Sequence, residues 1–139
     1  MTNLDKAIAI ATRAHAGQTD KGGNPYILHV LRVMMQFEDH DEMIVAVLHD
    51  VVEDTGLSAA DLEKYGFSEE IIASVDCLSR QRGESYDSFL NRIAQDDLAR
   101  RVKIADIKDN LNLTRLDQLS NRDIARARKY HKALKVLAE

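Results

Sequence analysis

The stretch that decides the fold is MIVAVLHDVV, residues 43–52, in which His49 and Asp50 are the only polar residues. The polar stretch EDHDE precedes it and Gly56 follows it, so the sequence predicts a helix over residues 41–54. A helix that is apolar on nearly all sides is normally buried. We therefore expect this helix to be the central element of the fold.

The segments around this helix also predict helices, because none shows sustained two-residue alternation and the chain contains a single proline. That proline, Pro25, suits the first turn of a helix. Ser58 and Asp61 have the spacing of a capping box. Helices are expected near residues 3–16, 25–37, 68–79, 86–95, 97–113 and 122–139, with a further short helix that begins at Ser58. The predicted fold class is all-α, a single-domain helical bundle over residues 1–139.

Composition narrows the function classes. The 139 residues carry a formal net charge of −4, which gives no overall attraction for nucleic acid. Cys77 is the only cysteine, so neither an internal disulfide nor a cysteine-based zinc cluster can form. No run approaches the roughly 20 apolar residues that cross a bilayer, and the N-terminus does not read as a signal peptide. We expect a cytoplasmic protein without a membrane or nucleic-acid partner.

The polar pair inside the apolar stretch is the first candidate site. A carboxylate buried in a helical bundle is unfavourable unless it is paired or binds a metal. Asp50 is followed by Glu53 and Asp54, and these spacings place the acids within about one helical turn of His49. Repulsion among three carboxylates favours a bound cation.

Two further residues could complete a metal site. His29 is the only histidine in the apolar segment after Pro25, and Asp106 lies in the otherwise apolar run VKIAD. Taken singly, His29 could be a core histidine and Asp106 a salt-bridge partner. Imidazole mixed with carboxylates suits manganese or iron, with zinc or nickel possible.

Three motifs resemble those of a known family. HAGQTDKGGNPYILHVLRVM (residues 15–34), AVLHDVVEDT (46–55) and VKIADIKDNLNL (102–113) are similar, in the same order, to motifs of the RelA/SpoT-type alarmone hydrolase domain. That domain belongs to the HD phosphohydrolase superfamily. The resemblance implies a guanosine-3′,5′-bis(diphosphate) 3′-pyrophosphohydrolase with an all-α HD fold and a small nucleotide as substrate.

The resemblance also implies roles for particular residues. It implies that four residues bind manganese: His29, His49, Asp50 and Asp106. It implies that Glu53 and Asp54 position and activate the attacking water. Lys21 matches a basic position of the family, and Asn110 is implied to hold the nucleotide sugar.

Two positions depart from the family pattern. Asp20 stands where an arginine, implied to stack on guanine, usually precedes Lys21, and an acid cannot make that cation–π contact. Ile107 replaces a commonly basic residue. Two alternatives therefore stay open: an HD phosphohydrolase for another nucleotide or phosphoester, and a metal- or alarmone-binding module without turnover. The sequence leaves the oligomeric state open.

Overall fold

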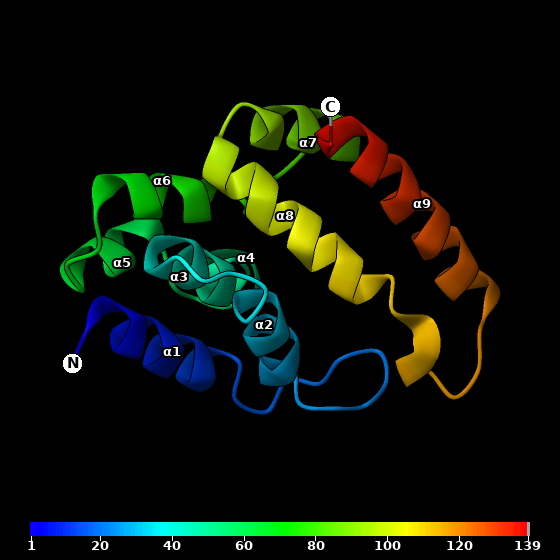
Figure 1. Ribbon diagram of the computed structural model, residues 1–139, viewed down its shortest axis with the longest axis horizontal. Helices are drawn as coiled ribbons and strands as arrows, with labels where there is room; N and C mark the ends of the chain where they lie inside the picture. Colours follow the sequence, from blue (N-terminus) through cyan, green and yellow to red (C-terminus); the bar gives the residue numbers. More distant parts are fainter. Residues whose placement is uncertain (139) are drawn as a thin grey trace.

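The computed structural model describes residues 1–138, and over that range the chain is all-α, as predicted (Figure 1). The α-helices are α1 (Asn3–Ala14), α2 (Ile27–Met34), α3 (His40–Leu48), α4 (Val51–Asp54), α5 (Ala59–Lys64), α6 (Glu69–Cys77), α7 (Tyr86–Ala94), α8 (Asp97–Asn110) and α9 (Asn121–Leu137). A short 3-10 helix, η1 (Leu113–Arg115), joins α8 to α9. None of the helices within residues 1–138 is both long enough and apolar enough to span a bilayer.

Helix α3 is the central element, and this prediction is confirmed. Residues 44–48 are all buried, and α3 contacts four other helices: α1, α2, α6 and α8. Apolar side chains from most of the helices pack around it in one core cluster. The residues at the C-terminal end of α3 are therefore held by surrounding packing on several sides.

The prediction of one continuous helix over residues 41–54 is wrong. Helix α3 ends at Leu48, and the single turn of α4 begins at Val51. Between them Asp50 has φ −102° and ψ −1°, and the N–H of His49 donates to the carbonyl of Ala46 at 3.4 Å, a three-residue spacing. The His49 ring also bonds to that carbonyl, and this competes with the helical ladder.

Other helix boundaries differ less from the prediction. Helix α2 begins at Ile27, two residues after Pro25, and the first turn is tightened by a bond from the N–H of Leu28 to the carbonyl of Pro25 at 3.1 Å. The predicted capping box of Ser58 and Asp61 is present, and Thr2 with Asp5 forms another. These caps satisfy N–H groups that a helix start leaves free.

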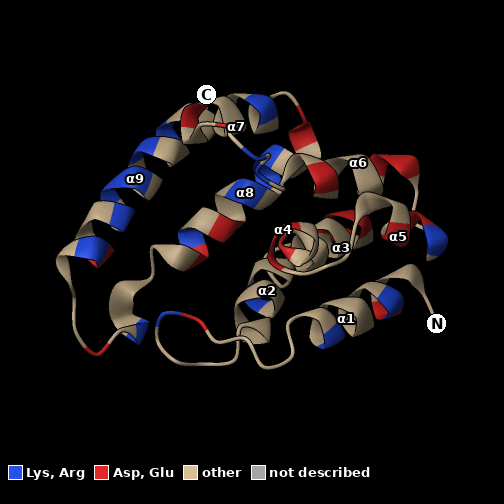
Figure 2. Cartoon of the chain, turned by 180° about the vertical axis from the view of Figure 1, so that it is seen from behind, with Lys and Arg blue, Asp and Glu red and all other residues tan. Residues whose placement is uncertain are grey.

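Helices α8 and α9 pack against each other and against α7. Helix α8 crosses the centre of the molecule and packs on α2, α3, α6 and α7, while α9 runs along one side against α7 and α8 (Figure 1). Lysines and arginines gather on α9, and acidic residues are frequent on α5 and α6 (Figure 2). The loop between α1 and α2 lies near η1, because a Cβ added to Gly22 would come within 3.1 Å of the carbonyl oxygen of Arg115.

Candidate functional site

Four side chains from three parts of the fold converge at one point. His29 comes from α2, His49 and Asp50 from the junction of α3 and α4, and Asp106 from α8. One ligand atom of each lies within 4.8 Å of the others. Asp106 Oδ1 lies 2.9 Å from His29 Nε2 and 3.3 Å from His49 Nε2. The structure thus brings together all four residues that the sequence singles out for a metal.

The break between α3 and α4 orients His49. Its Nδ1 lies 2.5 Å from the carbonyl oxygen of Ala46, which can only accept, so Nδ1 carries the proton. Nε2 is buried and has no hydrogen-bond partner within residues 1–138, although Asp50 Oδ2 is 3.0 Å away. A buried nitrogen left in this way among carboxylates fits a divalent metal ion, so the cluster could hold one.

The electrostatics of the cluster also favour a cation. Burial by itself lowers the pKa of His49, but Asp50 and Asp106 outweigh it and hold that pKa well above its usual value. Burial opposes ionisation of Asp106, yet Lys103 and His49 lower the pKa of its carboxyl well below the usual range. The carboxylates therefore stay charged, and a metal would take the place of the imidazole protons.

Residues around the cluster hold its members in place. The hydroxyl of Tyr26 donates to Asp50 Oδ2, and Lys103 Nζ lies 3.0 Å from Asp106 Oδ2. Asn110 Nδ2 donates to Asp106 Oδ1 at 3.1 Å, so this predicted substrate residue touches the cluster itself. Neither Tyr26 nor Lys103 was singled out from the sequence. The spacing of three between Lys103 and Asp106 was the available signal.

A cavity of about 560 Å³ opens beside the cluster. His29, Tyr26 and Arg115 line it, and the Arg115 side chain is 26% exposed. The predicted substrate residues, Lys21 and Asn110, are also part of the lining, together with Arg126. A cavity with cationic groups next to a metal-type cluster has the chemistry to bind a phosphorylated small molecule.

The structure separates the predicted catalytic pair. Asp54 lines the cavity, and its carboxylate makes no hydrogen bond within residues 1–138. Burial, with Asp50 and Glu53 nearby, raises the pKa of Asp54 to about 6. Glu53 instead turns to the loop after α6, where Oε1 accepts the N–H of Arg80 at 2.8 Å. Only Asp54 lies where it could meet a molecule in the cavity.

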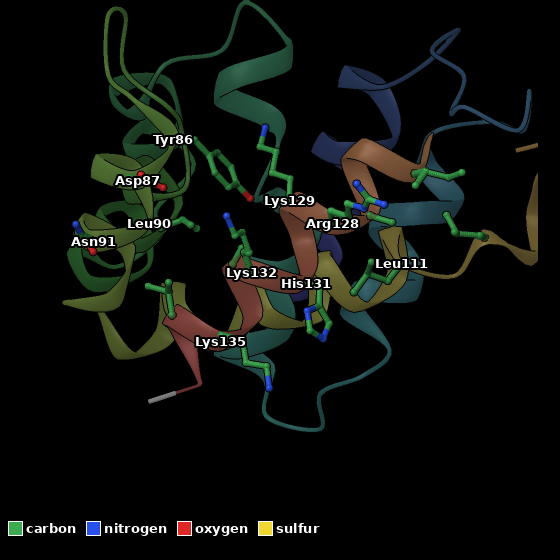
Figure 3. A pocket seen from close by; sticks show the side chains of 15 residues that line it. Tyr86, Asp87, Leu90, Asn91, Leu111, Arg128, Lys129, His131, Lys132 and Lys135 are labelled. Atoms are coloured by element: carbon green, nitrogen blue, oxygen red, sulfur yellow. The ribbon is translucent and has the colours of Figure 1, made fainter. Parts of the chain in front are cut away.

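A larger cavity lies elsewhere. It measures about 1330 Å³ and flanks α9, with Tyr86 and Leu90 of α7 facing Lys129 and Lys132 of α9 (Figure 3). Its lining contains one acid, Asp87, and none of the clustered His and Asp residues. Size alone does not make it the better candidate, because the groups that could hold a metal are at the smaller cavity.

Comparison with known proteins gives the relatives of this chain. A protein of Escherichia coli (strain K12) named bifunctional (p)ppGpp synthase/hydrolase SpoT is 31% identical over 122 residues, 78% of this chain. A protein of Aquifex aeolicus (strain VF5) named guanosine-3′,5′-bis(diphosphate) 3′-pyrophosphohydrolase is 28% identical over 120 residues, also 78% of this chain. The chain is related to the RelA/SpoT-type hydrolases. No family model matches it.

The extent of the similarity differs between the comparisons. The chain spans 17% of the length of these two curated RelA/SpoT-type relatives. A solved structure of a metazoan ortholog of SpoT that hydrolyzes ppGpp matches with a TM-score of 0.78 over 99% of this chain and 86% of that one. At 22% identity this match establishes a common fold. The predicted RelA/SpoT-type fold is thereby confirmed.

Asp20, which departs from the RelA/SpoT pattern, shapes its own loop. Its Oδ1 accepts the N–H groups of Gly22 and Asn24, both at 2.9 Å. Its own N–H donates to the carbonyl of Asn24 at 2.8 Å. Asp20 also lines the cavity, where Lys21 follows it. One carboxylate oxygen is therefore committed to the backbone of the loop that carries Lys21.

Proposed function

We propose that this protein is a metal-dependent nucleotide phosphohydrolase that removes pyrophosphate from the 3′ position of guanosine 3′,5′-bis(diphosphate). The observation that carries the proposal is the buried His29–His49–Asp50–Asp106 cluster at the wall of a cavity with cationic groups. The printed names of the relatives support the choice of substrate. The proposal includes a cytoplasmic location and a small-molecule nucleotide as the partner.

Manganese is the proposed ion, held by the four residues of the cluster. Two imidazoles with two carboxylates form a mixed nitrogen and oxygen donor set, which suits manganese or iron and leaves zinc or nickel possible. The chemistry supplied by such an ion is polarisation of a phosphoryl oxygen and activation of water. Tyr26 and Lys103 each bond one carboxylate oxygen of the cluster, which fixes the orientation of Asp50 and Asp106.

The residues of the cavity take the remaining roles in the proposed reaction. Asp54 accepts the proton of the attacking water, because its carboxylate faces the cavity and is free of other bonds. Lys21 and Arg115 bind phosphate groups, since both are cationic and line the cavity. Asn110 uses its amide N–H for Asp106 and keeps its carbonyl oxygen for the sugar. The products are a nucleoside diphosphate and pyrophosphate.

Asp20 favours a second candidate within the same reaction class. Its carboxylate occupies the cavity wall where the RelA/SpoT pattern has an arginine, so a different nucleotide or phosphoester could be the substrate. A binding module without turnover is the third possibility. The unbonded Asp54 argues against it, because a pure binding site has no need for a free carboxylate beside the phosphates.

One experiment separates these possibilities. The purified protein with Mn²⁺ is offered ppGpp, pppGpp, common nucleotides and a generic phosphodiester, and release of pyrophosphate or phosphate is followed. Pyrophosphate release from ppGpp supports the proposal. Turnover of another compound alone supports the second candidate, and binding of ppGpp without any turnover supports the third.

A further inference from the structure

Asp109 joins the metal-type cluster to two arginines outside it. Its Oδ2 lies 2.6 Å from His29 Nδ1, on the opposite side of the ring from the nitrogen that faces Asp106. Arg32 forms a bidentate pair with the same carboxylate, at 2.9 Å to Oδ1 and 3.1 Å to Oδ2. Arg115 approaches Oδ2 to 3.5 Å and also donates to the backbone carbonyl of Asp109 at 3.1 Å.

These contacts leave Asp109 little freedom to move. Its side chain is 8% exposed, and a carboxylate removed from water to this extent must be paired. A bidentate guanidinium fixes the plane of the carboxylate as well as its charge. The partners come from α2 and η1, so Asp109 is held by elements that flank the C-terminal end of α8. The acceptor presented to His29 is therefore fixed in position.

A fixed acceptor decides which nitrogen of His29 carries the proton. A carboxylate can only accept, so the hydrogen bond to Asp109 places the proton on Nδ1. Nε2 lies 2.9 Å from Asp106 Oδ1 and faces the centre of the cluster, so a bound metal would take the place of a proton on Nε2, while Nδ1 keeps its proton. For His49 the Ala46 carbonyl has the same effect. The two acceptors differ in charge, and the carboxylate makes its imidazole the more basic ligand.

We infer that Asp109 is a positioning residue for the metal: it fixes the tautomer and ring orientation of His29, and Arg32 holds Asp109 in place. This inference rests on the proposed metal site, although it needs no particular substrate. The competing explanation is that Asp109 only ties α8 to α2. A structural tie of that kind would change stability without changing the ligand field of a bound ion.

The test measures metal binding without turnover. Asp109→Asn keeps the size of the side chain and replaces a charged acceptor with a neutral one. The matched control is Asp117→Asn, an exposed acid with no ion pair within residues 1–138. Isothermal titration with Mn²⁺ gives the Kd, and the d–d absorption of the Co²⁺-loaded protein reports the geometry around the ion. Circular dichroism of the metal-free variants checks folding.

Asp109→Asn is expected to raise the Kd for Mn²⁺ about 10- to 100-fold and to shift the Co²⁺ bands, with the control unchanged. A Kd within about threefold of wild type together with unchanged bands overturns the inference. If the wild-type protein itself binds neither ion, the proposed metal site falls and takes the inference with it. If the wild-type protein binds Mn²⁺ and Asp109→Asn binds it equally well with the same Co²⁺ bands, the inference about Asp109 falls and the proposed metal site stands.

A second variant covers the case in which Asp109→Asn does not fold. Arg32→Gln leaves the contact between Asp109 and His29 but removes the bidentate partner, and the Arg32 side chain is 36% exposed. A smaller rise in the Kd for Mn²⁺, of at least about threefold, supports the inference, because the effect must pass through Asp109. An unchanged Kd and an unchanged Co²⁺ spectrum overturn it.

Discussion

Replacing Asp54 with asparagine is expected to stop the proposed reaction while the protein still binds its metal. Asp54 lines the cavity beside the metal-type cluster, and its carboxylate has no other bond within residues 1–138. Loss of a general base costs about 10²- to 10⁴-fold in rate, which is about 2.7–5.4 kcal/mol of barrier. We expect kcat to fall by that factor. The Kd for Mn²⁺ should change little, because Asp54 lies outside the cluster of four.

The neighbouring acid supplies a matched control. Glu53 Oε1 accepts the N–H of Arg80, and glutamine keeps an oxygen at that place. Glu53→Gln should therefore leave kcat within about threefold of wild type, which is about 0.65 kcal/mol. Both variants are assayed by pyrophosphate release under saturating substrate, with metal content measured by elemental analysis.

Two results would refute this reasoning. If Asp54→Asn keeps kcat within about threefold of wild type, Asp54 does not activate the water. If Glu53→Gln falls as far as Asp54→Asn, the two acids act together, and the division of roles drawn from their contacts is wrong.

Three other changes test the fold, its charge pairs and the cavity loop. Ile93→Ala, in the fully buried part of α7, should lower the free energy of unfolding by about 2–5 kcal/mol in urea titration, with metal affinity unchanged. Arg92, with the N–H of Gln81, lowers the pKa of Glu84 from 4.5 to about 2. The pair therefore stabilises the fold fully above about pH 4.5 and is lost as the pH falls through about 2. The difference in Tm between wild type and Glu84→Gln should shrink over the same interval. Asp20→Ala removes the acceptor of two loop N–H groups and should raise the KM for ppGpp, whereas Asp20→Asn keeps an oxygen and should raise it less.

The sequence was informative where a polar residue interrupts an apolar run. Asp50 and Asp106 stood out because an isolated charge in a core segment needs a partner, and the structure places them together. The burial of the central helix was predicted because the helix is apolar on nearly all sides. The break at residues 49–50 could not be predicted, because periodicity does not report that the His49 ring bonds to the Ala46 carbonyl.

Residues that act through contacts with other side chains were harder to find. Glu53 and Asp54 were grouped because they are adjacent in the sequence, but the single turn of α4 directs Glu53 to Arg80 and Asp54 to the cavity. Tyr26 and Asp109 are polar residues near apolar segments, with nothing local to mark them. Tyr26 contacts Asp50, which is 24 residues away in the sequence, and Asp109 contacts His29, which is 80 residues away. Only the tertiary structure shows such contacts.

The packing around α3 has a consequence for how this protein would acquire its metal in the cell. The four side chains of the proposed metal site come from α2, α8 and the junction of α3 and α4, which pack in the same core. Where the ligands meet only when the chain folds around a metal, the free energy of metal binding becomes free energy of folding. Where the packing of a core positions the ligands, the choice of ion depends on the affinity of the site and on the supply of each metal. Since copper and zinc bind most nitrogen and oxygen sites more tightly than manganese does, the metal supply of the cell, rather than this chain, would determine which ion is loaded.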